Sequence, residues 1–169
     1  MKSKYIQYYV EGEDEEKLIR TLKTDLMCIK PGKVQKFNVV DCELTDARLA
    51  SLRPKTMVVL IFDTDTGSSS ILAKNLKKLK GCPNVSEIIT IPQVPNLEGE
   101  LIRSCNVKGI TELLNSQSRD GFKTDFIHVT NLKAKLNEHK FSIRKLWTGK
   151  PKGPYKTIEN EAERIKIIK

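Results

Sequence analysis

A nearly unbroken apolar stretch, TMVVLIF at positions 56–62, constrains the fold of this chain more than any other segment. Strands that are apolar on both faces are typical of parallel sheets, because helices cover both sides of such sheets. We therefore predict that residues 56–62 form a central strand and that the fold class is α/β. Two aspartates, Asp63 and Asp65, follow this strand directly.

Segments on both sides of this stretch alternate between strand and helix patterns. The predicted additional strands are residues 5–10, 34–40 and 85–91. The predicted helices are a segment that starts at residue 13, residues 45–52, and a segment with a leucine stripe that ends near Gly81. This order predicts a mainly parallel sheet of at least four strands over residues 1–95, with helices on both faces.

Residues 96–169 have a different character and are predicted to form a basic, mainly helical extension packed on the core. Helical patterns cover residues 97–105, 107–114, 130–137 and a segment near 143–147, and polar loops are predicted at 115–121 and 148–156. The net charge of the chain is +9, and residues 123–169 contain twelve Lys and Arg against five Asp and Glu. A surface of this kind is either simply solvated or binds a phosphate backbone.

Several classes of protein are disfavoured by what the sequence lacks. No apolar window approaches the length of a membrane span, and the N-terminal segment has no signal cleavage pattern, so we expect a cytoplasmic protein. The four cysteines are widely scattered, form no CxxC pair and lie far in sequence from both histidines. A zinc site or a disulfide framework is therefore not expected.

Acidic residues follow the first predicted strand and the central strand. Glu11 comes after the former, and Asp63 and Asp65 after the latter. Ligands of open α/β sheets bind at the carboxyl ends of the strands, so these three side chains converge if the two strands are neighbours. Clustered carboxylates repel one another, and a divalent cation relieves the repulsion. We predict a Mg²⁺ site, with Mn²⁺ as a substitute, at this edge.

The same residues resemble a known family. A strand ending Val10-Glu11-Gly12, followed later by a hydrophobic strand ending Asp63-x-Asp65-x-Gly67, resembles the Toprim domain over roughly residues 4–95. That domain occurs in topoisomerases, primases, recombination mediators, ribosomal RNA maturases and nucleases of the OLD (overcoming lysogenization defect) family. The resemblance implies a Toprim-like, Rossmann-like fold. It also implies Glu11 as acid/base or metal ligand, and Asp63 and Asp65 as magnesium ligands.

Three further acidic residues follow from the resemblance. OLD-type nucleases carry a second glutamate four residues after the first, and Glu15 occupies that position, although Asp14 or Glu16 could replace it. Small Toprim nucleases carry additional acid after the fourth strand, where Glu98 and Glu100 stand here. These two residues could equally begin a helix in the ordinary way.

Alternative families fit less well. The segment from Asp63 to Thr66 also matches the nucleophile motif of haloacid-dehalogenase-like phosphatases, but that family places the motif on its first strand, and Glu11 would have no role. Topoisomerases, primases and recombination mediators need a cleavage domain or zinc module that we do not find here. A nuclease that acts on DNA or RNA is the prediction that remains.

The basic segment supplies candidate contacts to nucleic acid. Trp147 and Tyr155 could stack on bases or dock this segment on the body of the protein. OLD-type systems pair Toprim nucleases with ABC-type ATPases, so the chain could also be a module that needs such a partner, or an RNA-binding protein whose carboxylates are structural. The oligomeric state stays open. The predicted phosphate contacts are Lys140, Arg144, Lys145, Lys150 and Lys152.

Overall fold

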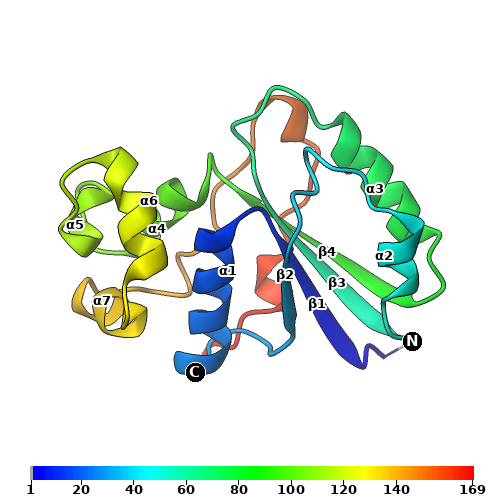
Figure 1. Ribbon diagram of the computed structural model, residues 1–169, viewed down its shortest axis with the longest axis horizontal. Helices are drawn as coiled ribbons and strands as arrows, with labels where there is room; N and C mark the ends of the chain where they lie inside the picture. Colours follow the sequence, from blue (N-terminus) through cyan, green and yellow to red (C-terminus); the bar gives the residue numbers. More distant parts are fainter. Residues whose placement is uncertain (1) are drawn as a thin grey trace.

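The computed structural model describes residues 2–169 and contains one sheet of four parallel strands (Figure 1). The strand order is β2-β1-β3-β4, and every neighbouring pair is parallel. The strands are β1 (Tyr5–Val10), β2 (Lys33–Lys36), β3 (Thr56–Asp63) and β4 (Val85–Gln93). This arrangement confirms the predicted α/β class and is compatible with a Rossmann-like fold.

The predicted central strand is β3, which pairs with β1 on one side and β4 on the other. Successive side chains of β3 enter two different hydrophobic clusters, one on each face of the sheet, because side chains alternate along a strand. Val59 and Ile61 belong to the cluster beneath the first helix, and Val58 and Leu60 to the opposite cluster. Burial on both faces explains why this segment is apolar at consecutive positions.

Strand β2 is shorter than predicted, ending at Lys36 instead of residue 40. The side-chain oxygen of Asn38 accepts hydrogen bonds from the backbone N–H groups of Val40 and Asp41, which turns the chain away from the sheet. Val39 and Val40 are nevertheless buried in the core. Their apolar character therefore reflects burial in a turn and not a continued strand.

Helices cover both faces of the sheet. The first, α1 (Glu13–Arg20), continues into the π-helical turn η1 (Thr21–Asp25) and covers one face. The other face packs against α3, and α2 lies on the same side of the molecule (Figure 1). These two helices are α2 (Asp46–Ala50) and α3 (Ser70–Lys80).

Four helices beyond the sheet lie beside α1 and share its hydrophobic cluster (Figure 1). One of them, α6, was not predicted, since we expected a loop through Gly121. Ser118 caps this helix by accepting a 2.9 Å hydrogen bond from the Gly121 N–H, and Phe122 and Phe126 anchor it one turn apart. The four helices are α4 (Leu97–Ser104), α5 (Thr111–Leu114), α6 (Arg119–His128) and α7 (Leu132–Glu138).

Residues 139–169 are mostly irregular and return to the sheet. The predicted helix near 143–147 is a series of turns, and the φ of Trp147 is +56°, which no α-helix accommodates. Two short 3₁₀ turns follow, η2 (Gly153–Tyr155) and η3 (Ala162–Arg164), and Lys166 forms an antiparallel bridge with Ile29. No helix in residues 2–169 combines the length and apolar character needed to cross a bilayer.

Candidate metal centre

Three carboxylates meet at the carboxyl edge of the sheet. Glu11 follows β1, Asp63 ends β3, and Glu15 lies in the first turn of α1. One oxygen of each lies within 4.8 Å of an oxygen of the other two. Because β1 and β3 are neighbours, the structure brings Glu11 and Asp63 together as the strand order requires.

The start of α1 determines where Glu15 points. Gly12 precedes the helix in an extended conformation, and its N–H donates a 3.1 Å hydrogen bond to Oε2 of Glu15. A side chain at Gly12 would place its Cβ 3.2 Å from Oδ1 of Asp14 and 3.4 Å from Oε2 of Glu15. Glycine thus lets the chain pass close to the carboxylates, and the hydrogen bond turns the Glu15 side chain back toward Glu11.

Burial makes the ionised forms of these carboxylates unfavourable. It raises the pKa of Asp63 to about 9, and a hydrogen bond shared with Glu11 adds to the shift. Burial also raises the pKa of Glu15 to about 9, with a further contribution from the neighbouring Asp14. The pKa of Glu11 is raised as well, chiefly by burial. Without a cation, the cluster therefore retains protons at neutral pH instead of carrying three negative charges.

Asp65 does not belong to this close group. We expected Asp65 to converge with Glu11 and Asp63, but β3 ends at Asp63. The N–H of Thr64 bonds to the carbonyl groups of Gln93 and Pro95, which redirects the chain. Asp65 is exposed and accepts a 3.3 Å hydrogen bond from Asn96, although its charge still raises the pKa values of Glu11 and Asp63.

A hollow of about 270 Å³ opens beside the three carboxylates. Oδ1 of Asp14 is buried there without a hydrogen-bond partner, and Nζ of Lys123 lies 3.8 Å from the other oxygen of Asp14. Magnesium prefers carboxylate oxygens and binds through only one or two of them, with water in its remaining positions. The donor set, the unpaired Asp14 oxygen and the raised pKa values all fit a divalent cation.

Gln93, at the end of β4, holds Asp63 in place. Nε2 of Gln93 donates a 2.7 Å hydrogen bond to Oδ1 of Asp63, and Oε1 of Gln93 accepts a 3.2 Å bond from the indole N–H of Trp147. Sequence reasoning missed Gln93, Asn96 and Lys123. The only available signal for Gln93 was its position just past the predicted fourth strand, at the same edge as Asp63.

The two additional acidic residues have different surroundings. Glu98 lines the hollow and lies 3.5 Å from Arg119. Glu100 is fully buried, accepts hydrogen bonds from the backbone N–H groups of Val94 and Trp147, and pairs with Arg103 at 2.7 Å. These contacts give Glu100 a structural role, so only Glu98 faces the candidate site.

The predicted phosphate contacts are all exposed but lie in two places. Lys150 and Lys152 belong to a segment that runs along the carboxyl edge of the sheet. Two contacts hold this segment there: Trp147 donates to Gln93, and Tyr155 donates to the Ser68 carbonyl. The segment that carries Lys140, Arg144 and Lys145 passes the end of α4, where the Ser142 N–H donates to the Ser104 carbonyl.

The two aromatic residues considered for base stacking, Trp147 and Tyr155, are buried. Trp147 is 2% exposed and Tyr155 is fully buried. Trp147 belongs to the hydrophobic cluster beneath α1, and Tyr155 to the cluster on the opposite face. Both side chains therefore dock the segment on the sheet and offer no stacking surface for bases.

No protein-family model, curated protein or solved structure matches this chain. The Toprim resemblance therefore stays a prediction. It rests on Glu11, Asp63 and Asp65 and on the order of the strands that carry them.

Proposed function

We propose that this protein is a magnesium-dependent nuclease of the Toprim type that hydrolyses phosphodiester bonds in DNA or RNA. The observation that carries the proposal is the close approach of three carboxylates. Glu11 and Asp63 lie at the ends of the adjacent parallel strands β1 and β3, and Glu15 lies on helix α1. The exposed cations Lys150 and Lys152 on the segment along the same edge support a polyanionic substrate.

Each residue of the site has a defined part in this proposal. Glu11, Glu15 and Asp63 would hold the cation, with the exposed Asp65 beside them. Bound Mg²⁺, or Mn²⁺ in its place, stabilises negative charge on phosphoryl oxygens and lowers the pKa of water. Gln93 holds Oδ1 of Asp63 with a hydrogen bond and so orients this carboxylate.

Hydrolysis requires proton transfer as well as charge stabilisation. Water adds across the P–O bond, so the attacking water loses a proton and the leaving oxygen gains one. Glu11 lies beside Asp63, and burial raises the pKa of Glu11, which favours an acid/base role. Lys123 lines the hollow, with its ammonium group 3.8 Å from Asp14, and would hold a phosphate oxygen.

A cleavage panel tests the proposal. The substrates are transfer RNA, ribosomal RNA, single-stranded DNA and duplex DNA, each with Mg²⁺, Mn²⁺ or EDTA. We expect metal-dependent cleavage of at least one substrate by the parent protein and its loss in Glu11→Gln and Asp63→Asn, which preserve side-chain volume. Glu138→Gln and Asp120→Asn make the same chemical changes at exposed positions on α7 and α6 and should leave cleavage intact.

Three outcomes of this panel and of parallel measurements of metal and nucleic-acid binding count against the proposal. Cleavage by the two site variants at the parental rate would overturn it. Binding of metal and nucleic acid by a folded chain that cuts no substrate would favour a module that acts only with a partner, such as an ABC-type ATPase. Absence of divalent metal binding would favour an RNA-binding protein whose carboxylates are structural.

A further inference from the structure

A second and larger hollow lies at the opposite, amino end of the strands. It has a volume of about 790 Å³, which is within the range of about 300–1,000 Å³ typical of ligand sites. The first residues of β1 and β3 line it, together with the loop before β2 and the loop between α2 and β3. We call it the basic cleft, since its lining includes the cationic residues Lys2, Lys4, Lys30, Lys33 and Arg53.

The charge of the basic cleft is not balanced by nearby carboxylates. In residues 2–169, none of its five cationic side chains forms an ion pair. The single acidic residue of the lining, Glu87, accepts a 2.7 Å hydrogen bond from Ser3 and pairs with Arg164. Ser3 also lines the cleft, whereas Arg164 lies outside it, and five cationic residues against one glutamate leave the cleft with an excess of positive charge.

The acidic cluster formed by Glu11, Glu15 and Asp63 is too far away to neutralise this charge. Strand β3 runs from Thr56 at the cleft to Asp63 at the cluster, and its eight residues span about 23 Å. The Debye length at physiological ionic strength is about 8 Å. The two ends of the sheet therefore present separate fields of opposite sign, and the cleft attracts anions on its own.

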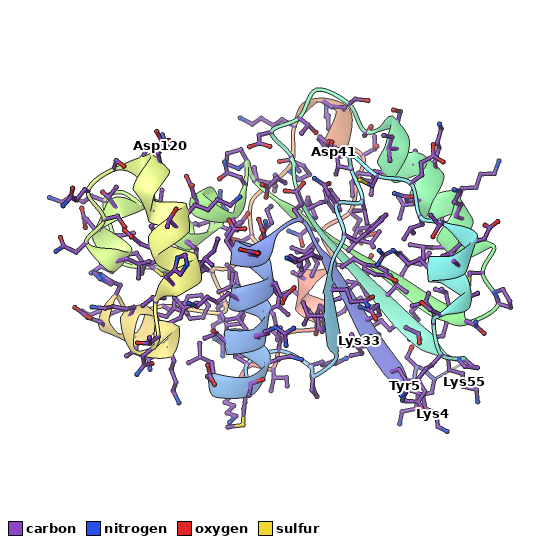
Figure 2. All side chains as sticks on the ribbon, in the orientation of Figure 1. Lys4, Tyr5, Lys33, Asp41, Lys55 and Asp120 are labelled. Atoms are coloured by element: carbon purple, nitrogen blue, oxygen red, sulfur yellow. The ribbon has the colours of Figure 1, made fainter. Side chains whose placement is uncertain are left out.

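An aromatic ring stands among these cations. Tyr5 is 38% exposed, and the guanidinium of Arg53 lies 4.9 Å from the centre of its ring. Figure 2 shows Lys4, Tyr5 and Lys55 side by side at this end of the molecule, opposite Asp41 at the carboxyl edge. Planar aromatic and guanidinium groups both stack on nucleobases, and ammonium groups bind phosphate.

The cleft has a rigid frame. The hydroxyl of Tyr8 donates a 2.5 Å hydrogen bond to the Lys30 carbonyl, and Lys23 donates a 2.6 Å bond to the Gly32 carbonyl. A Cβ at Gly32 would come within 2.7 Å of the Ile6 carbonyl oxygen, so the loop before β2 lies directly against β1. The loop that carries Lys30 is therefore held in position before any ligand binds, as is Lys33 at the start of β2.

From these observations we propose that the basic cleft binds a nucleotide unit, with the phosphate among the lysines and the base against Tyr5 and Arg53. The unit is either a free nucleotide or part of a nucleic-acid strand, because both present the same phosphate and base. This site is distinct from the acidic cluster, and the proposal does not depend on nuclease activity.

Binding measurements in EDTA test the cleft separately from the metal centre. Calorimetry with AMP and ATP, and fluorescence anisotropy with labelled twelve-nucleotide single-stranded DNA and RNA, distinguish a free nucleotide from a strand. We expect at least one of these probes to bind the parent protein, and Lys4→Glu together with Lys33→Glu to weaken that binding at least tenfold. Lys108→Glu together with Lys133→Glu changes the net charge equally at exposed positions outside the cleft and should weaken binding less than threefold.

A second pair of variants tests the aromatic contact. Tyr5→Phe keeps the ring and should bind like the parent, whereas Tyr5→Ala should weaken binding about tenfold. Heparin serves as a polyanion without bases. Failure of every nucleotide probe to bind would overturn the proposal, and so would equal weakening by the two double variants. The proposal would also be overturned if heparin binding depended on Lys4 and Lys33 while Tyr5→Ala left nucleotide binding unchanged. The cleft would then be an unspecific cationic surface.

Discussion

Gln93 connects Asp63 to Trp147 through two hydrogen bonds made by opposite ends of one amide group. The amide nitrogen donates to the carboxylate of Asp63, and the amide oxygen accepts from the indole of Trp147. Residue 63 ends a strand of the sheet, whereas residue 147 belongs to the irregular C-terminal segment. The orientation of a candidate metal ligand therefore depends on a segment more than eighty residues away in the chain.

Removing the Gln93 amide should weaken metal binding without removing a ligand. Gln93→Met keeps similar volume but cannot donate to Asp63, and residues that orient metal ligands typically contribute about 10–100-fold in metal affinity. We expect a loss in that range for Mn²⁺ by calorimetry, at unchanged stoichiometry. Gln117→Met, at an exposed loop position, is the control. Parental Mn²⁺ affinity in Gln93→Met would show that Gln93 does not position Asp63.

The stability of the metal-free protein should fall as the pH rises from about 4 to about 9. In this window the folded protein binds more protons than the unfolded chain, because the pKa values of Glu15 and Asp63 are raised to about 9 from ordinary values near 4. Thermal melts in EDTA at pH 5 and pH 8.5 measure the effect. Asp63→Asn should reduce the pH dependence, and Asp120→Asn should not. A parental slope in Asp63→Asn would contradict the assignment.

Divalent metal should stabilise the parent protein and distinguish Asp63 from Asp65. At a hundredfold excess over Kd, binding to the folded state adds about 2.7 kcal/mol to the free energy of unfolding, which corresponds to a rise of several degrees in Tm. Asp63→Asn should abolish this rise. Asp65→Asn should retain most of it, because Asp65 lies outside the close carboxylate group. Equal losses in both variants would indicate that the loop after β3 rearranges to bring Asp65 to the metal.

Glu100 should be essential to stability but not to metal binding. Its carboxylate is fully buried, accepts hydrogen bonds from two backbone N–H groups and pairs with Arg103. Glu100→Ala leaves these donors without a partner, so we expect a loss of about 2–4 kcal/mol in the free energy of unfolding by urea denaturation. Glu98→Ala, at the rim of the hollow, should cost less than about 1 kcal/mol. An equally small cost for Glu100→Ala would exclude the structural role.

Local sequence patterns determined the sheet and part of the acidic cluster. The apolar run at 56–62 predicted the central strand because burial on both faces requires apolar side chains at consecutive positions. Glu11 and Asp63 were identified because carboxyl ends of parallel strands share one edge of a sheet. The segments where local patterns misled, around Asn38 and Trp147, owe their conformations to hydrogen bonds that a hydrophobicity pattern does not encode.

Tertiary structure decided which acids lie together and what surrounds them. Asp65 follows Asp63 by only two residues, yet the bonds of Thr64 to Gln93 and Pro95 turn it away from the close group. Glu15 joins that group because the Gly12 N–H holds its side chain toward Glu11. Gln93 and the lining of the basic cleft come from strands and loops distant in the chain. Such contacts depend on how the elements pack, and a linear sequence records only which residues are available to make them.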